Sequence, residues 1–166
     1  MVDVSSGKVG LCPEHIGLLD TLEELRAKLV RLGCMGDIPR ENEWQNLCRW
    51  LRGFSRELED HMSCEETNFF PVVDWGLGGG EESPTRFVLA EHQQIRRILE
   101  DVRKVATPSL GASEDQFWPY FGRLSELMSI LTSTLTSHIR SEDRIFFPLG
   151  QQILHQRMVD KQNPAQ

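Results

Sequence analysis

The sequence predicts an all-α fold, an up-down-up-down four-helix bundle followed by a short C-terminal helical tail. Three observations support this: apolar residues spaced three and four positions apart, helix start and stop residues between the apolar stretches, and an internal repeat. The repeat is a single His, then His-x-x-x-Glu-x-x-x-Phe-Phe-Pro 46 residues later, and its second copy lies 77 residues after the first. Two matching halves of two helices each predict a bundle with approximate two-fold symmetry.

The helix start and stop residues place the four helices at about 13–33, 40–70, 84–106 and 114–147. Pro13 suits a first helical position, and Ser83 with Pro84 reads as an N-cap followed by a first residue. Ser113 and Gln116 form a capping box, the segment Asp37 to Pro39 interrupts the first hairpin, and Pro119 could kink or delay the fourth helix. The helical tail is expected from Leu149 to about Met158.

Both halves carry matching apolar stripes that lead into or out of the repeated histidines. The second helix has Trp44, Leu47, Leu51, Phe54 and Leu58, and the fourth has Phe121, Leu124, Met128, Leu131 and Leu135. The first helix has Leu18, Leu22, Leu25 and Leu29 after its histidine, and the third has Ile95, Leu99, Val102 and Ala106. These stripes predict that the repeated histidines face the core, near one end of the bundle.

The chain is expected to be one domain over 1–166, with a core of about 13–148 and two pseudo-repeats, 13–71 and 84–148. The Gly-rich stretch 74–83 joins them, and without a following Gly-Lys-Ser/Thr it reads as a linker, not a phosphate loop.

The repeated polar residues are candidate metal ligands: His15, His61, Glu65, His92, His138 and Glu142. A His and a Glu four residues apart share one helix face, so both can reach the same ion or two neighbouring ions. Four imidazoles and two carboxylates exceed what one ion needs, and a carboxylate can bridge two ions. The set therefore predicts a dinuclear centre, with iron as the favoured metal and manganese as a possible one, because no thiolate lies in register.

The composition excludes several classes of binding partner. The chain has 18 Lys+Arg against 25 Asp+Glu, a net charge of -7 and no basic cluster, which argues against nucleic acid and anionic membranes. No apolar stretch approaches the roughly 20 residues of a membrane span, and the first residues lack a leader pattern. The four cysteines form no C-x-x-C pair and are expected to be reduced. We expect a cytoplasmic protein whose partner is small.

On these residues the chain resembles the hemerythrin-like family, also called HHE cation-binding domains, over about 13–148. The resemblance implies a hemerythrin-like bundle with a non-haem di-iron centre. An oxo or hydroxo group would bridge the two iron ions. Its terminal ligands would be His15, His61, His92 and His138, and its bridging carboxylates Glu65 and Glu142. Ferritin-like bundles use inward-facing Glu-x-x-His instead, and the sequence has none.

The sequence departs from the oxygen carriers of that family at one place. Those proteins carry a further His four residues after the third-helix ligand, where this chain has Arg96. They also use His-x-x-x-x-Asp on the last helix, which Asp143 would satisfy, whereas the internal repeat favours Glu142. The chain thus resembles the four-histidine, two-carboxylate branch, in which sensing, iron handling and peroxide chemistry occur.

Three functions follow as expectations. The first is a di-iron protein whose open site binds or senses dioxygen, nitric oxide or peroxide, or which handles iron. The alternative is an oxidoreductase acting on peroxide, similar to a catalase, and a weaker third is a metal that only holds the helices together. A diatomic ligand or peroxide is the expected partner, and the sequence points to no particular protein partner.

Other residues are expected to play lesser parts. Cys12 and Cys64 could approach the site, but both are expected to be packed thiols and not ligands. Tyr120 lies about 27 Å from His138 along a straight helix, so it is not expected to be an extra ligand. His155 has no counterpart in the repeat and is expected at the surface.

Glu14 and Glu91 each precede a candidate ligand and match across the halves. Sequence neighbours point away from each other on a helix, so a solvated or capping role is expected for both.

The two Phe-Phe-Pro segments are expected to pack in the core and to stop their helices.

Overall fold

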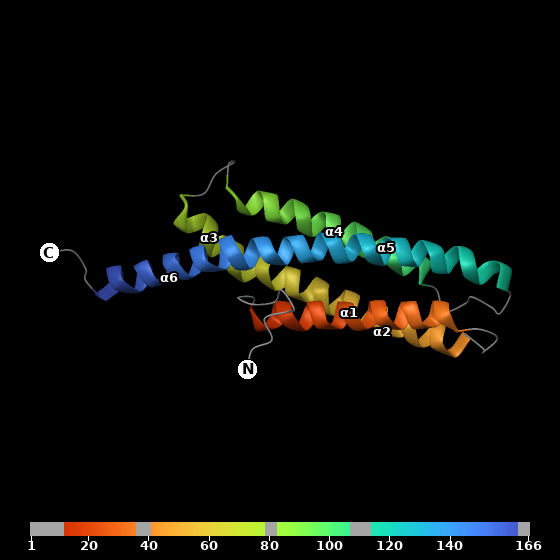
Figure 1. Ribbon diagram of the computed structural model, residues 1–166. Helices are drawn as coiled ribbons and strands as arrows, with labels where there is room; N and C mark the ends of the chain where they lie inside the picture. The colour runs from red at the N-terminus through yellow and green to blue at the C-terminus, as the bar shows by residue number, and fades with distance from the viewer. Residues whose placement is uncertain (1–11, 36–40, 79–82, 107–113, 163–166) are drawn as a thin grey trace, which may run out of the picture.

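The computed structural model describes residues 12–35, 41–78, 83–106 and 114–162, with the side chains of 114–116 and 157–162 left out. Within these ranges it contains helices and no strand, which confirms the all-α prediction. Four long helices form the bundle: α1 (Pro13–Cys34), α2 (Glu41–Cys64), α4 (Thr85–Val105) and α5 (Glu114–Ser141). Figure 1 shows them running side by side, with α1 and α2 below α4 and α5.

The helices close a ring in which α1 packs on α2 and α5, and α4 packs on α2 and α5. The predicted stripe residues fill the space between them, and all are buried except Phe121, which is partly buried. Trp44, Leu58, Leu99, Leu124 and Leu135 are among the largest fully buried side chains. Burying side chains of this size stabilises the bundle by roughly 1.5–3 kcal/mol each, and this core fixes the register in which the histidines meet.

Two π-helical segments interrupt the long helices at matching positions. η2 (Glu65–Phe69) follows α2 and leads into α3 (Phe70–Gly76), and η3 (Glu142–Phe146) follows α5 and leads into α6 (Phe147–Gln162). In each, the helix continues past a Phe-Phe-Pro segment instead of stopping, so that prediction was wrong. The amide of Phe70 bonds to Glu65, and that of Phe147 to Glu142, five residues back. This change of register places the prolines in the first turn of a new helix, where a missing N–H costs nothing.

The other helix boundaries lie close to the predictions. α4 begins at Thr85, one residue later than expected, with Pro84 at the N-cap position. The Ser83 hydroxyl donates to Asp74 and does not cap the helix. The Thr85 hydroxyl also donates to Asp74. α5 continues through Pro119. The tail α6 is longer than predicted, and Figure 1 shows it extending beyond the bundle. The expected capping box of Ser113 and Gln116 lies outside the described side chains.

The end of the bundle that carries the repeated histidines is covered by α3 and α6, which pack on each other. Phe70, Val73, Val88 and Phe146 form a second small apolar cluster there. Across the described helices, none is long and apolar enough to span a membrane.

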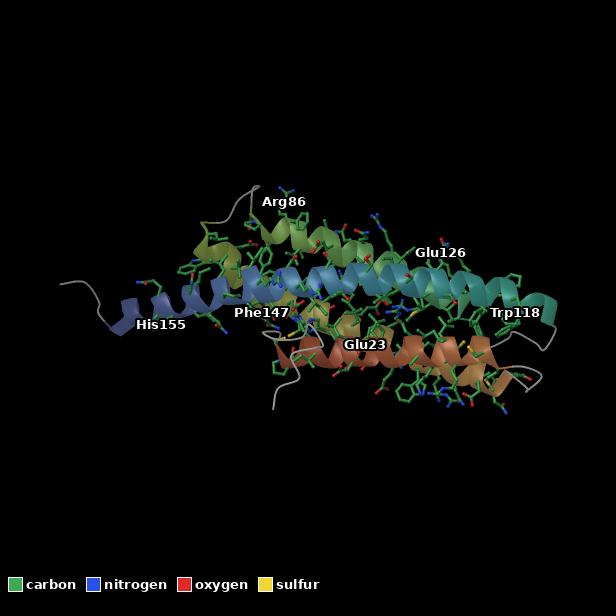
Figure 2. All side chains as sticks on the ribbon, in the orientation of Figure 1. Glu23, Arg86, Trp118, Glu126, Phe147 and His155 are labelled. Carbon is green, nitrogen blue, oxygen red and sulfur yellow. The ribbon has the colours of Figure 1, made fainter. Side chains whose placement is uncertain are left out.

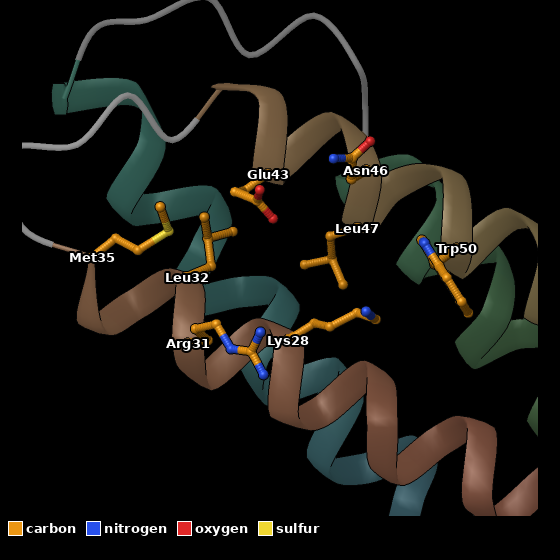
Figure 3. A pocket seen from close by; sticks show the side chains of 8 residues that line it. All are labelled: Lys28, Arg31, Leu32, Met35, Glu43, Asn46, Leu47 and Trp50. Carbon is orange, nitrogen blue, oxygen red and sulfur yellow. The ribbon is translucent and has the colours of Figure 1, made fainter.

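A pocket of about 430 Å³ lies between the last turns of α1 and the first turns of α2 (Figure 3), at the other end of these helices from His15 and His61. Lys28 lies over the Trp50 ring, 4.6 Å from its centroid, on one side of this pocket. The pocket includes none of the repeated histidines or glutamates.

Candidate metal centre

The structure brings all six sequence-predicted ligand residues together at one level of the bundle. Each bundle helix contributes one histidine: His15 from α1, His61 from α2, His92 from α4 and His138 from α5. Glu65 and Glu142 are the first residues of the two π-helical segments. Five of the six are buried, and His61 is the one that keeps some solvent contact.

The histidines meet in two pairs that repeat the symmetry of the sequence. Nε2 of His15 lies 3.0 Å from Nε2 of His61, and Nε2 of His92 lies 3.1 Å from Nε2 of His138. The rings of each pair meet edge to face. Each pair joins two neighbouring helices that are antiparallel partners in one half of the chain.

The two carboxylates lie between the histidine pairs. Glu65 presents Oε1 to His61 at 3.1 Å and Oε2 to His92 at 3.5 Å. Glu142 presents Oε2 to His138 at 3.3 Å and to His15 at 3.5 Å. The donor atoms therefore form two groups within 4.8 Å, one of His15, His61, Glu65 and Glu142, the other of Glu65, His92, His138 and Glu142. Both carboxylates belong to both groups.

Three histidines are held from behind by a further carboxylate at Nδ1. His15 faces Asp143 at 2.8 Å, and His92 faces Glu66 at 2.9 Å. His138 faces Glu91 at 3.0 Å. Carboxylates behind metal-ligating histidines fix the ring orientation and raise the basicity of the other nitrogen. His61 has Glu14 in the corresponding place at 3.6 Å, beyond hydrogen-bond distance.

The sequence pattern did not predict that these carboxylates support the histidines, and the solvated or capping role expected for Glu91 was wrong. Sequence neighbours do point away from each other, but Glu91 reaches across to a histidine on the next helix, α5. The signal present in the sequence was the 77-residue offset, which relates Glu14 to Glu91 and Glu66 to Asp143. This offset shows that the carboxylates belong to the same repeat as the histidines.

The donor set fits a cation. A carboxylate at Nδ1 can only accept, so Nδ1 carries the proton of a neutral imidazole and Nε2 turns a lone pair toward the centre. All four oxygens of Glu65 and Glu142 are buried and have no hydrogen-bond partner among the described residues. Lone pairs and carboxylate oxygens converging in a buried site require a compensating positive charge. His/Glu groups of this kind could hold metal ions.

In the metal-free protein, protons supply part of this charge. Burial lowers the pKa of His15, but the nearby carboxylates of Glu65 and Asp143 outweigh burial and raise it to about 9. Burial raises the pKa of Glu65, but the nearby imidazoles of His15 and His61 outweigh this and lower it to about 2. Burial raises the pKa of Glu142 and lowers that of His138. A bound cation would thus compete with protons for the same atoms.

An aromatic layer closes the histidine end of the bundle. Phe147 meets the His15 ring at 5.4 Å, and Phe70 meets the His92 ring at 5.5 Å. Phe69 stacks on Phe147 at 4.6 Å between ring centroids. The phenylalanines of the Phe-Phe-Pro segments therefore pack against the core, as predicted, and cover the rings of His15 and His92.

The remaining candidates lie outside the two groups. The Cys12 sulfur accepts from the His15 amide and caps α1, and its amide donates to Asp143 at 3.0 Å. Cys64 is exposed and accepts from Asn68. Tyr120 is exposed. Figure 2 shows His155 on the part of α6 that extends past the bundle, and this side chain is exposed as expected.

Arg96 occupies the place where the oxygen carriers have another histidine. Its guanidinium donates to the same Glu66 oxygen that faces His92, at 2.8 Å. Because a guanidinium stays charged and has no free lone pair, Arg96 supports the carboxylate and adds no donor to the site.

Fold and site define a four-helix bundle with a buried His/Glu cluster able to hold metal ions. The family described as "Hemerythrin HHE cation binding domain" matches residues 11–150, and the chain belongs to this family. Membership implies binding of non-haem iron, and hemerythrin-like domains bind small ligands such as oxygen.

Curated relatives are iron-sulfur cluster repair proteins YtfE. Those of Edwardsiella ictaluri and Escherichia coli O81 are 29% identical and that of Yersinia pseudotuberculosis 30%, each over 107 residues. The match covers 63% of this chain and 46% of each relative, so the chain matches about half the length of these proteins. No solved structure matches the chain.

Proposed function

We propose that the six repeated residues hold two iron ions, one in each His-His-Glu-Glu group, with Glu65 and Glu142 shared between them. The observation that carries this proposal is that both carboxylates belong to both groups. A single ion would use one group and leave protons as the only counter-charge in the other. Manganese has similar ligand preferences and is the second candidate metal.

We further propose that this centre binds a small ligand, dioxygen, nitric oxide or peroxide, or takes part in iron handling. Iron bound here supplies coordination positions for such a ligand and one-electron redox chemistry. Four imidazoles and two carboxylates are fewer donors than two six-coordinate ions take, and Arg96 adds none. The name of the relatives, iron-sulfur cluster repair, supports iron handling as the role.

The protein's own residues set the conditions for binding. Asp143, Glu66 and Glu91 hold the Nδ1 protons and so direct three Nε2 lone pairs to the centre. The rings of Phe70 and Phe147 keep water from one side.

The first test is the iron content of protein produced with iron, which we expect to be two per chain. His61→Ala and His138→Ala should lower it, and His155→Ala, on the exposed part of α6, should not. One iron per chain, or mainly zinc, would contradict the dinuclear proposal.

The second test concerns the ligand. The reduced protein is mixed anaerobically with dioxygen or nitric oxide, the oxidised protein with peroxide, and the absorption bands of the iron are followed. A spectral change with at least one is expected. Sustained dioxygen release from peroxide would favour the oxidoreductase, and no response to any of the three would favour a structural metal.

A further inference from the structure

The two halves of the site can be compared position by position, because the 77-residue offset relates every residue of one to a residue of the other. They differ most at His61 and His138, which are equivalent. The side chain of His61 is 11% exposed and that of His138 is 2% exposed. His15 and His92, the other equivalent pair, are both fully buried. His61 is thus the most exposed histidine of the site.

The carboxylates behind these two histidines differ in the same direction. Glu91 lies 3.0 Å from Nδ1 of His138 and is 22% exposed. Its equivalent, Glu14, lies 3.6 Å from Nδ1 of His61 and is 81% exposed. A solvated glutamate at that distance does not fix the imidazole ring. His61 can therefore turn away from the site without breaking a hydrogen bond at Nδ1.

The carboxylates behind His15 and His92 each accept a second hydrogen bond, which holds them in place. Asp143 accepts from His15 and from the Cys12 amide, and Glu66 accepts from His92 and from Arg96.

We propose that the half-site of His15 and His61 is where metal enters and leaves, and that the half-site of His92 and His138 retains its metal. This inference rests on the proposed dinuclear centre. Metal release requires ligands to detach one after another, and the ligand that detaches first is the one least held by the protein. Fixing a ligand histidine by a carboxylate is worth about 10–100-fold in metal affinity. Among the four histidines, only His61 has no carboxylate within hydrogen-bond distance of Nδ1 in the described part of the chain.

The test is metal release from the full chain loaded with ferrous iron, mixed anaerobically with excess ferrozine as the capturing chelator. Two phases of equal amplitude are expected, with the fast phase about tenfold faster or more. His61→Ala should retain one iron per chain and show only the slow phase. A single phase for both irons, or loss of the slow phase in His61→Ala, would overturn the assignment.

A matched pair of isosteric variants tests the cause. Glu91→Gln replaces the charged carboxylate behind His138 by a neutral amide, whose oxygen accepts more weakly, and it should accelerate the slow phase by about tenfold. Glu14→Gln changes the equivalent residue, which makes no such bond, and it should leave both phases as they are. Equal effects of the two variants, or no effect of Glu91→Gln, would contradict the role of the carboxylate.

The iron content before chelation separates this inference from the proposed function. Two irons per chain that leave together refute the inequivalence of the half-sites alone. Fewer than two irons in the loaded wild-type protein refute both.

Discussion

Asp143 accepts a hydrogen bond from Nδ1 of His15 at 2.8 Å, joining the first turn of α1 to the π-helical segment 128 residues later in the chain. Glu142, the residue before it, points into the site instead. Both acidic residues satisfy a ligand spacing on the last helix, but their places differ. Glu142 belongs to both donor groups, and Asp143 lies behind His15.

These places predict different effects of substitution. Glu142→Ala removes a donor shared by both groups and should lower the iron content to one per chain or less. Asp143→Ala removes only the support of His15, so two irons should still bind at saturating iron, with affinity lower by about 10–100-fold. Iron titrations of both variants check this. Full iron content in Glu142→Ala, with loss in Asp143→Ala, would show that Asp143 is the ligand.

Removal of the metal should destabilise the protein, because it leaves buried lone pairs and carboxylate oxygens facing each other. Metal at a free concentration a thousandfold above its dissociation constant contributes about 4 kcal/mol to the free energy of unfolding. Thermal unfolding with and without chelator should therefore show a clear decrease in midpoint. His155→Ala should unfold like the wild type in both conditions, and a wild-type midpoint insensitive to chelator would argue against a metal that supports folding.

Metal affinity should rise with pH. The pKa of His15 is about 9 in the metal-free protein, so at neutral pH its Nε2 carries a proton that metal must displace. Below that pKa, if binding releases one proton, the apparent metal affinity falls about tenfold for each unit by which the pH is lowered. Apparent affinities at pH 7 and pH 8, with proton release measured by calorimetry in two buffers, check this. Affinity that is constant over this range would mean that no proton leaves.

The same proton acts on the stability of the metal-free protein. The folded pKa of His15 lies above its ordinary value of 6.5. Its contribution to the free energy of unfolding is therefore fully present below pH 6.5 and is lost as the pH rises through about 9. Chelator-treated protein should become less stable over that range, and metal-loaded protein should not follow it.

Two glycine substitutions should have opposite effects on stability. A Cβ on Gly150 would lie 2.5 Å from Cε2 of Phe69, in the layer that closes the site. Gly150→Ala should cost about 1–3 kcal/mol through overpacking, and should weaken metal retention as Phe69 shifts against Phe147. Gly53 lies inside α2, and a Cβ added there would meet nothing within 4 Å, so Gly53→Ala should stabilise by about 0.5–1 kcal/mol. Denaturant unfolding of both variants checks the signs.

The thiols should react at different rates. Burial raises the pKa of the Cys48 thiol to about 11, and the side chain is fully buried in the core. Cys34 and Cys64 are exposed and should be alkylated first. Cys48 should react only when the protein unfolds, which mass spectrometry after timed alkylation can follow. Early labelling of Cys48 in folded protein would show that α2 is not packed as described.

The sequence alone was sufficient to predict the helices, their core faces and the residues that could gather at one level of the bundle. Stripes such as Leu47, Leu51 and Leu58 follow from the period of a regular helix, and the 77-residue repeat carries that period across both halves. The stripes are local features, since each depends on residues a few positions apart in one helix, and the repeat is visible in the sequence itself. That is why the all-α bundle and the positions of the four helices could be read before any contact was known.

Tertiary structure decided the features that depend on which helices are neighbours. The i,i+4 spacing of His138 and Glu142 gave no sign that the backbone changes register at Glu142, and so the helices were expected to end at Phe-Phe-Pro. Glu91 was expected to be solvated because its partner, His138, lies 47 residues away on another helix. The exposure that separates His61 from His138 arises only when the bundle is assembled, because solvent contact is a property of the packed surface and not of the sequence pattern.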